Sequence, residues 1–317
     1  MSDAGLVEDL PPEEVVDAVD RALALHAGAL DHPLNILARL GGREMSYVSD
    51  ADVMFVHDPV EGAEEGLAQE YATAVATRLR SLLGSTGPEP ALEVDADLRP
   101  EGRNGPLVRS LASFTEYYER WAAVWESQAL LRARHVAGSV ELWEAFERLI
   151  DPLRYPEGGL ADSDTREIRR IKARVESERL PRGVSPARHL KLGPGGLSDV
   201  EWTAQLLQLQ HAGAVPELRT TSTVRALEAA AEAGLVEAED VETLVHAGRL
   251  ASSLRDALVL WSGRASTSHA DQLPNDRRAL VGVARLLGFE SAQLLDEEYL
   301  RAARRARAVV DRVFYED

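Results

Sequence analysis

The sequence predicts an α+β protein in which a small sheet with helices precedes an all-α helical bundle. Short apolar runs of strand type fall between residues 34 and 98. From about residue 140 onward, apolar residues recur at helical spacing and no further strand is expected. Aromatic residues make up only 5% of the chain, whereas alanine, leucine, arginine and glutamate are frequent, so helix should dominate.

The length of the chain favours more than one folding unit. Its 317 residues exceed what a single hydrophobic core usually holds. We expect an N-terminal helix over residues 1–30, a domain that carries the sheet over 31–138, and a helical bundle over 139–317.

The expected elements begin with a helix whose first turn contains Pro11 and Pro12, where a missing amide costs nothing. A strand over 34–37 leads to a glycine turn at Gly41 and Gly42. The next strand covers residues 52–56, and Pro59 ends it because proline cannot continue a ladder.

A helix over residues 65–83 is predicted by apolar side chains that repeat at helical spacing. A third strand is expected over 91–98, followed by a turn at 103–106. Apolar residues from 114 to 133 then predict another helix. The second half contains helical periods around residues 168–175, 200–209, 224–230, 241–260, 280–287 and 295–313, separated by loops with glycine or proline. An antiparallel bundle is the economical packing.

Composition excludes several functions. With 53 acidic against 35 basic residues the net charge is −18, and no basic stripe suits a nucleic acid, although a single nucleotide is not excluded. There is no cysteine, hence no disulfide and no thiol nucleophile. No apolar run approaches the roughly 20 residues of a membrane span, and the first residues lack a signal peptide. We therefore expect a soluble, cytoplasmic protein.

Carboxylates on two of the expected strands predict a metal-dependent nucleotide site. Alternation places Asp50 and Asp52 on one side of their strand, opposite the buried Val53 and Phe55. On the third strand, Glu93, Asp95 and Asp97 share one face, and spacing alone does not separate Asp95 from Asp97. Like charges about 4 Å apart repel by about 4 kcal/mol at an effective dielectric near 20, so a divalent cation would turn that repulsion into binding.

Other residues are candidates with equally good structural interpretations. Gly41 and Gly42 allow close approach of a phosphate, with Ser49 and Arg43 as donors, but a Gly-Gly pair alone is usually a turn. Lys191 beside the Gly193–Gly196 loop could reach the nucleotide or simply be solvated.

Two further groups lie on expected helices. Asp199 and Glu201 open a helix, where acids are ordinarily favoured by the dipole. Glu126, Arg132 and Arg134 are expected on one helix, with Glu126 and Arg134 two turns apart as a possible ion pair. Of the eight histidines none stands at metal-ligand spacing, and His57 is interpreted as structural.

Four blocks stand out in order along the chain: residues 39–44 with 49–52, residues 94–108, residues 125–134 and residues 190–202. Together they resemble one enzyme family, the adenylyltransferase half of the bifunctional glutamine synthetase adenylyltransferase/adenylyl-removing enzyme. Residues 199–202 and the arginine-rich close at 304–310 look more like the C-terminal, transferring half, of actinobacterial type. Together the blocks are far more specific than any one of them.

The resemblance implies a polymerase-β-like nucleotidyltransferase domain followed by a helical bundle. It implies transfer of AMP from ATP to a tyrosine hydroxyl of glutamine synthetase, with release of pyrophosphate. Asp50, Asp52 and Asp95 would be the catalytic and metal-binding residues, for two Mg²⁺ ions or Mn²⁺. The residues that would bind the nucleotide are Gly41, Gly42, Arg43, Ser49 and Lys191. The residues expected to surround and support these ligands are Asp97, Glu126, Arg132, Arg134, Asp199 and Glu201.

The resemblance extends to partners and has two departures. Glutamine synthetase is the implied protein substrate, and a nitrogen-signalling protein is an expected regulator of the longer enzyme. Ala38 stands where the family usually has glycine, which affects the nucleotide loop. Asp97 stands where arginine is common, which adds negative charge beside the metal site.

Three alternatives stay open on the sequence alone. The same carboxylates could serve phosphorolytic removal of AMP. The chain could instead be a non-catalytic docking module whose acidic face is merely solvated. An RNA-end nucleotidyltransferase is opposed by the acidic charge and the missing basic groove.

Overall fold

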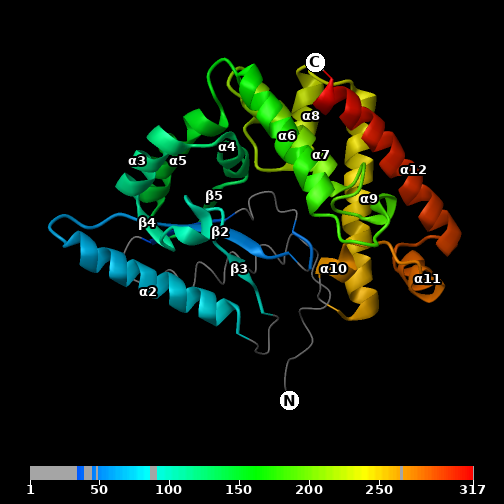
Figure 1. Ribbon diagram of the computed structural model, residues 1–317, viewed down its shortest axis with the longest axis horizontal. Helices are drawn as coiled ribbons and strands as arrows, with labels where there is room; N and C mark the ends of the chain where they lie inside the picture. The colour runs from blue at the N-terminus through cyan, green and yellow to red at the C-terminus, as the bar shows by residue number, and fades with distance from the viewer. Residues whose placement is uncertain (1–33, 39–44, 48, 86–90, 265–266, 317) are drawn as a thin grey trace. The chain divides into compact units, whose positions relative to one another are not determined.

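The computed structural model describes residues 34–38, 45–47, 49–85, 91–264 and 267–316 (Figure 1). The helix expected over residues 1–30 and the glycine turn lie outside these ranges. The chain divides into two compact units, residues 1–45 with 49–154, and residues 155–317 with 46–48. Each unit is described by itself.

The first unit contains a mixed five-stranded sheet built around strand β2 (Ala51–His57). On one side β2 pairs antiparallel with β1 (Leu34–Ala38), which also pairs antiparallel with β5 (Arg134–Ala137). On its other side β2 pairs parallel with β3 (Val94–Asp95) near its start and with β4 (Val108–Ser110) near its end. The strands expected at 34–37 and 52–56 are therefore confirmed.

Helices cover both faces of this sheet (Figure 1). Helix α2 (Glu65–Leu83) packs Ala72, Ala76 and Leu79 against Val53 and Phe55 of β2. On the opposite face Met54 and Val56 meet three further helices, which are α3 (Leu111–Trp121), α4 (Val124–Leu130) and α5 (Val140–Arg154). Strand β2 is thus apolar on both faces after Asp52, as a central strand requires.

The region expected as one helix from 114 to 133 is broken into α3, α4 and β5. Non-helical backbone at Ala122 and Ala123 ends α3 and starts α4, where the Glu126 carboxylate accepts a 2.9 Å hydrogen bond from the Ala123 amide. Strands β4 and β5 were not predicted, because three or four residues are too few to show a period. The strand expected over 91–98 shortens to Val94–Asp95 because the chain turns away directly afterwards.

The division between the units falls after Arg154, later than the expected boundary at residue 138. Helix α5 belongs to the first unit because Leu142, Phe146 and Ile150 pack into the core above the sheet. The Arg154 guanidinium also donates a 3.1 Å hydrogen bond to the Ala133 carbonyl, which closes the end of this unit.

The second unit is helical around α9 (Ala238–Ser262), the longest of its described helices. Helix α9 packs against α7 (Leu197–His211), α8 (Thr223–Glu232), α11 (Arg277–Leu286) and α12 (Ala292–Val310). Its core includes Leu254 and Leu258 of α9 with Tyr299. The other helices are α6 (Asp162–Glu178) and α10 (Thr267–Ala270), with short turns η3 (Pro186–Arg188), η4 (Pro216–Leu218) and the π-helical η5 (Asp311–Tyr315).

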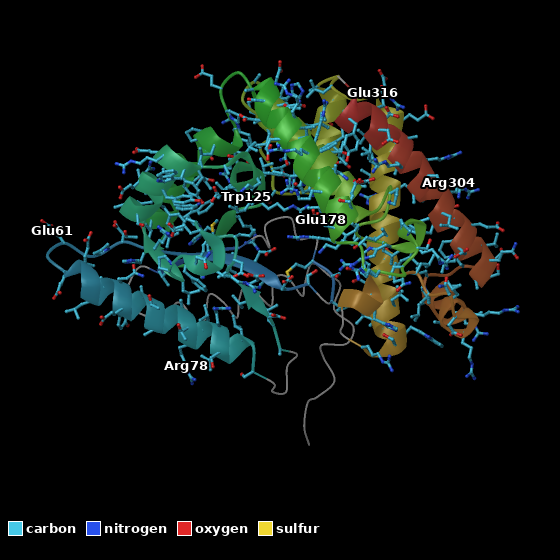
Figure 2. The ribbon with its side chains drawn as sticks, viewed as in Figure 1. Glu61, Arg78, Trp125, Glu178, Arg304 and Glu316 are labelled. Atoms are coloured by element: carbon cyan, nitrogen blue, oxygen red, sulfur yellow. The ribbon has the colours of Figure 1, made fainter. Side chains whose placement is uncertain are left out.

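Side-chain caps fix where several of these helices begin. Ser222, Asp276 and Ser291 each accept a hydrogen bond from an amide of the first turn, which satisfies a donor that the helix itself cannot. Charged side chains such as Arg78 of α2 and Arg304 of α12 point outward (Figure 2). None of the described helices is both long and apolar enough to cross a membrane.

Truncation of Phe146 tests whether α5 belongs to the first unit. The ring is fully buried and meets Phe114 edge to face at 5.1 Å between centroids. We expect Phe146→Ala to lower the free energy of unfolding of the first unit by about 3–5 kcal/mol in urea denaturation. The exposed Arg148→Ala on the same helix should change it by less than about 0.5 kcal/mol. Equal effects of the two substitutions would contradict this packing.

Candidate active site

The structure brings Asp52 and Asp95 together across the β2–β3 pair. The two residues are register partners on neighbouring parallel strands, whose backbones lie about 4.8 Å apart. The pairing is fixed one residue earlier by a 2.8 Å hydrogen bond from the Ala51 amide to the Glu93 carbonyl. Partners in register point to the same face of a sheet, so both carboxylates project from one side. Both residues are partly buried.

Asp50, the third carboxylate expected at the site, lies at the entrance to β2. It directly precedes the strand and is exposed to solvent. Ser49, the residue before it, is partly buried. Gly41, Gly42 and Arg43, the other residues expected to bind a nucleotide in this unit, lie outside the described residues.

Asp95 is held by the turn that follows it. The Asp97 amide donates a 2.7 Å hydrogen bond to Oδ1 of Asp95. Because β3 ends at Asp95, Asp97 does not share a strand face with it, contrary to the alternation expected over 91–98. The Asp97 carboxylate instead contacts Arg103 and Arg99, and the hydrogen bond from Arg103 lowers the pKa of Asp97.

Oxygen donors of this kind suit a hard divalent cation, although the carboxylates do not form a closed cage. In the ranges that the structure describes, no three acidic or histidine side chains stand close enough together to hold one ion. Mg²⁺ does not require such a cage, since it is usually bound by one or two carboxylates together with substrate phosphates and waters. A carboxylate has about four acceptor sites, so the bond from the Asp97 amide leaves Asp95 able to accept more. The residues present therefore fit the ion.

The three residues expected on one helix near the site lie on different elements. Glu126 is buried in the first turn of α4, and burial raises the pKa of its carboxyl group. Arg132 lies in the turn after α4, and Arg134 lies on β5. The expected spacing of two helical turns between Glu126 and Arg134 therefore does not exist, because the helix ends at Leu130.

In the second unit Lys191 is exposed on a tight loop, and Glu201 is partly buried on α7. The loop leaves no room for side chains at its glycines: a Cβ at Gly193 would lie 2.2 Å from the Pro186 carbonyl oxygen. The Leu192 amide donates a 3.0 Å hydrogen bond to Nδ1 of the buried His189. Lys191 thus projects from a rigid support.

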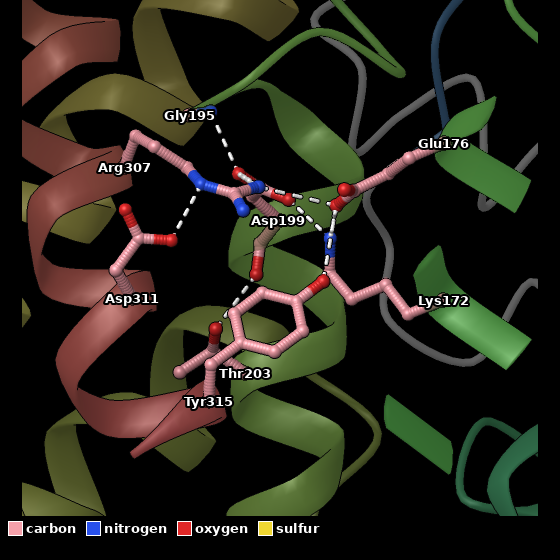
Figure 3. A network of polar contacts seen from close by, with 8 residues as sticks. All are labelled: Lys172, Glu176, Gly195, Asp199, Thr203, Arg307, Asp311 and Tyr315. Carbon is pink, nitrogen blue, oxygen red and sulfur yellow. Dashed lines mark hydrogen bonds and ion pairs between the residues drawn. The ribbon is translucent and has the colours of Figure 1, made fainter. Parts of the chain in front are cut away.

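Asp199 is the centre of a buried polar group that we call the Asp199 network, made with Lys172, Glu176, Arg307 and Tyr315 (Figure 3). Asp199 and Lys172 are each 2% exposed and form a direct ion pair. Arg307 of α12 lies 3.3 Å from Asp199 and 3.2 Å from Glu176. Burial lowers the pKa of Lys172, but Asp199 and Glu176 outweigh burial and the net shift is upward.

The Asp199 network joins helices α6, α7 and α12 to one another, so we interpret it as a structural group. Asp199 also accepts a 2.7 Å hydrogen bond from the Gly195 amide, which ties α7 to the loop that carries Lys191 (Figure 3). Sequence reasoning did not find Lys172, Arg307 or Tyr315. The i,i+4 spacing of Lys172 and Glu176 was the only local signal, and such pairs usually lie on exposed faces.

The two units match two enzyme families. Residues 20–149 match the family described as glutamate-ammonia ligase adenylyltransferase, and residues 168–316 match the family described as GlnD PII-uridylyltransferase. The chain is similar to proteins named bifunctional glutamine synthetase adenylyltransferase/adenylyl-removing enzyme from Streptomyces coelicolor (55% identity), Mycobacterium avium (54%) and Mycobacterium tuberculosis (54%).

These similarities extend over 281 residues, which are 88% of this chain and 28% of each relative. The chain therefore spans less than a third of the length of the curated relatives that it matches. The resemblance to the glutamine synthetase adenylyltransferase family that the sequence blocks indicated is confirmed.

Removal of Asp199 should destabilise the second unit strongly. Asp199→Ala leaves the buried Lys172 and the partly buried Arg307 with less compensation, and breaking a buried pair costs about 3–5 kcal/mol. Urea denaturation of the variant should show this loss in the free energy of unfolding. Arg170→Ala, which removes an exposed pair with Glu167, is the control and should cost less than about 1 kcal/mol. If both variants lost a similar amount of free energy of unfolding, the buried Asp199 network would contribute no more to stability than an exposed ion pair.

His189 should make the second unit sensitive to acid. Burial lowers the pKa of its imidazole, and Nδ1 must be unprotonated to accept from the Leu192 amide, although Asp271 nearby favours the cation. Stability is therefore complete above the unfolded pKa of about 6.5 and falls as pH drops below it, because the unfolded chain then binds the proton more readily. Urea midpoints measured across this range should fall more steeply for wild type than for His189→Asn, which keeps an acceptor but does not titrate. Parallel curves would contradict this assignment.

Proposed function

We propose that this chain is a nucleotidyltransferase that passes AMP from Mg-ATP to a tyrosine hydroxyl of glutamine synthetase and releases pyrophosphate. The observation that carries the proposal is the register pairing of Asp52 with Asp95, next to Asp50. The family matches support the same activity, and the relatives' name contains it. We further propose that the first unit has the polymerase-β-like arrangement, in which carboxylates from neighbouring strands serve one site.

In this proposal Asp50, Asp52 and Asp95 bind two Mg²⁺ ions, or Mn²⁺ in their place. When bound, the ions neutralise the phosphates and lower the pKa of the attacking hydroxyl. Without a cation, two carboxylates at the distance between neighbouring strands repel each other by a few kcal/mol at an effective dielectric near 20. A bound cation removes this repulsion, so the arrangement favours cation binding. Asp95, whose orientation is set by the Asp97 amide, is the group best placed to accept the tyrosine proton.

The nucleotide-binding roles of Gly41, Gly42, Arg43, Ser49 and Lys191 stay predictions. Glycines at the turn would let backbone amides approach phosphate, and the Ser49 hydroxyl can donate to it. Lys191 suits a phosphate as a point charge on a rigid loop. A nitrogen-signalling protein is the proposed regulator, in keeping with the match of the second unit to a PII-uridylyltransferase family.

The reverse activity, phosphorolytic removal of AMP, is the second candidate because the relatives' name includes both activities. Two incubations separate them: unmodified glutamine synthetase with labelled ATP, and AMP-modified synthetase with inorganic phosphate. Label on the synthetase in the first supports transfer, and release of ADP in the second supports removal. A docking module would give neither.

Substitution of the paired carboxylates tests the site. We expect Asp52→Asn and Asp95→Asn each to lower AMP transfer at least about 100-fold, because each removes a metal-binding charge. Intact-mass analysis of glutamine synthetase, with one AMP added per subunit as the signal, measures the effect. Asp58→Asn changes an exposed carboxylate just after β2 and should keep full activity. Undiminished transfer by Asp52→Asn would exclude this site.

A further inference from the structure

The loop between β3 and β4 closes on itself directly after Asp95. The chain leaves the sheet at Asp95, makes the short turn η2 (Gly102–Asn104) and returns to the sheet at Val108. A Cβ at Gly105 would lie 2.3 Å from the Pro100 carbonyl oxygen, so only glycine allows this closure. The loop is therefore compact, although it is bounded by strands of only two and three residues.

Arg99 holds the two ends of this loop together from inside. Its side chain is largely buried, and its Nε and Nη2 atoms each lie 3.2 Å from the Gly105 carbonyl oxygen. Its Nη1 atom donates a 2.7 Å hydrogen bond to the Ala96 carbonyl. One planar guanidinium thus joins the first residue of the loop to Gly105 near its other end, which a single ammonium cannot do in the same geometry.

A second pair strengthens the loop from its outer side. Glu101 has a left-handed backbone with φ of 62°, a conformation that costs a residue other than glycine of order 1 kcal/mol or more. Its carboxylate forms an ion pair with Arg109 of β4, whose side chain is mostly buried. The strained backbone is therefore kept in place by a specific contact.

The contact from Arg99 reaches Asp95 through one peptide group. The Ala96 carbonyl that accepts from Arg99 and the Asp97 amide that donates to Asp95 belong to the same planar unit. Fixing the carbonyl oxygen therefore fixes the direction of the N–H bond on its other side. That N–H bond is the donor to Oδ1 of Asp95 at 2.7 Å.

We propose that Arg99 is a positioning residue for the Asp95 carboxylate, acting through the peptide between residues 96 and 97. The proposal rests on the function proposed above, since it assigns Arg99 to the same metal-binding site. Arg103 provides the contrast: it contacts the same Asp97 carboxylate as Arg99, but its side chain is 84% exposed. Arg99 acts on the peptide orientation, whereas Arg103 acts on a solvent-accessible charge.

Matched substitutions of these two arginines test the inference on the full chain. Arg99→Lys keeps the positive charge but loses the bridge to both carbonyls. We expect it to weaken Mn²⁺ binding, measured by isothermal titration, about 10- to 100-fold and to lower kcat for AMP transfer more than it changes KM for glutamine synthetase. Arg103→Lys should change either quantity by no more than about twofold, because an exposed pair contributes little.

A measurement on the folded protein separates positioning from unfolding. Hydrogen exchange of the Asp97 amide, followed by NMR at a temperature where circular dichroism shows the variant folded, should be at least about tenfold faster in Arg99→Lys and unchanged in Arg103→Lys. Glu101→Gln, which loosens the loop without touching Arg99, provides a milder variant with an intermediate exchange rate.

The outcomes are distinct. Unchanged Mn²⁺ affinity and unchanged Asp97 exchange in Arg99→Lys overturn the positioning role and leave the proposed function standing. Failure of the wild-type protein to bind Mn²⁺ or to transfer AMP overturns the proposed function, and the link from Arg99 to a metal site falls with it. Faster Asp97 exchange together with weaker Mn²⁺ binding supports both.

Discussion

The parallel pairing of two short strands is the constraint on which the candidate active site depends. β3 is two residues long, yet its register with β2 places Asp95 opposite Asp52. A slip of one residue would turn Asp95 toward the α2 face, where Val94 and Ala96 now pack, and would leave an acid in an apolar core. The hydrophobic pattern around the aspartates therefore enforces the acidic pair.

Two polar arrangements stabilise the structure, one in a loop with little regular structure and the other between three helices. In the first unit, Arg99 and the Glu101–Arg109 pair hold a loop that has almost no ladder of its own. In the second, the Asp199 network joins α6, α7 and α12 around a buried ion pair. Arg99 donates to two backbone carbonyls and Asp199 accepts from the Gly195 amide, whereas the other contacts pair charged side chains with one another. The interior of a protein penalises polar groups that lack such partners.

The sequence predicted the strongly periodic elements well and the short ones poorly. Helix α2 shows a clear helical period over many residues, and the continuous apolar run of β2 is typical of a central strand; both elements appear where expected. β4 and β5 are too short for periodicity to reveal, and their existence depends on pairing with distant strands. The break between α3 and α4 falls at two alanines, which favour helix but here have a non-helical backbone, so tertiary packing overrides propensity there.

For the site, alternation correctly placed Asp52 opposite the buried Val53 and Phe55, but no sequence pattern could show the register that brings Asp95 beside it. Asp199 illustrates the opposite case. Its place near a helix start suggested a role at the surface or at a ligand, whereas its partners Lys172 and Arg307 come from helices far apart in the chain. Contacts between such distant segments are set by the fold and leave no local trace.

The contact between Gly195 and α12 has an evolutionary consequence. A Cβ at residue 195 would lie 1.9 Å from the carbonyl oxygen of Ala303, and the backbone there has φ of +74°, so two independent reasons demand glycine. Because the obstacle is main chain and not a flexible side chain, no second substitution elsewhere can make room by shrinking a neighbour. Only a shift of the whole helix would do so. Related sequences that keep this close approach of α12 to the loop are therefore expected to keep glycine at residue 195.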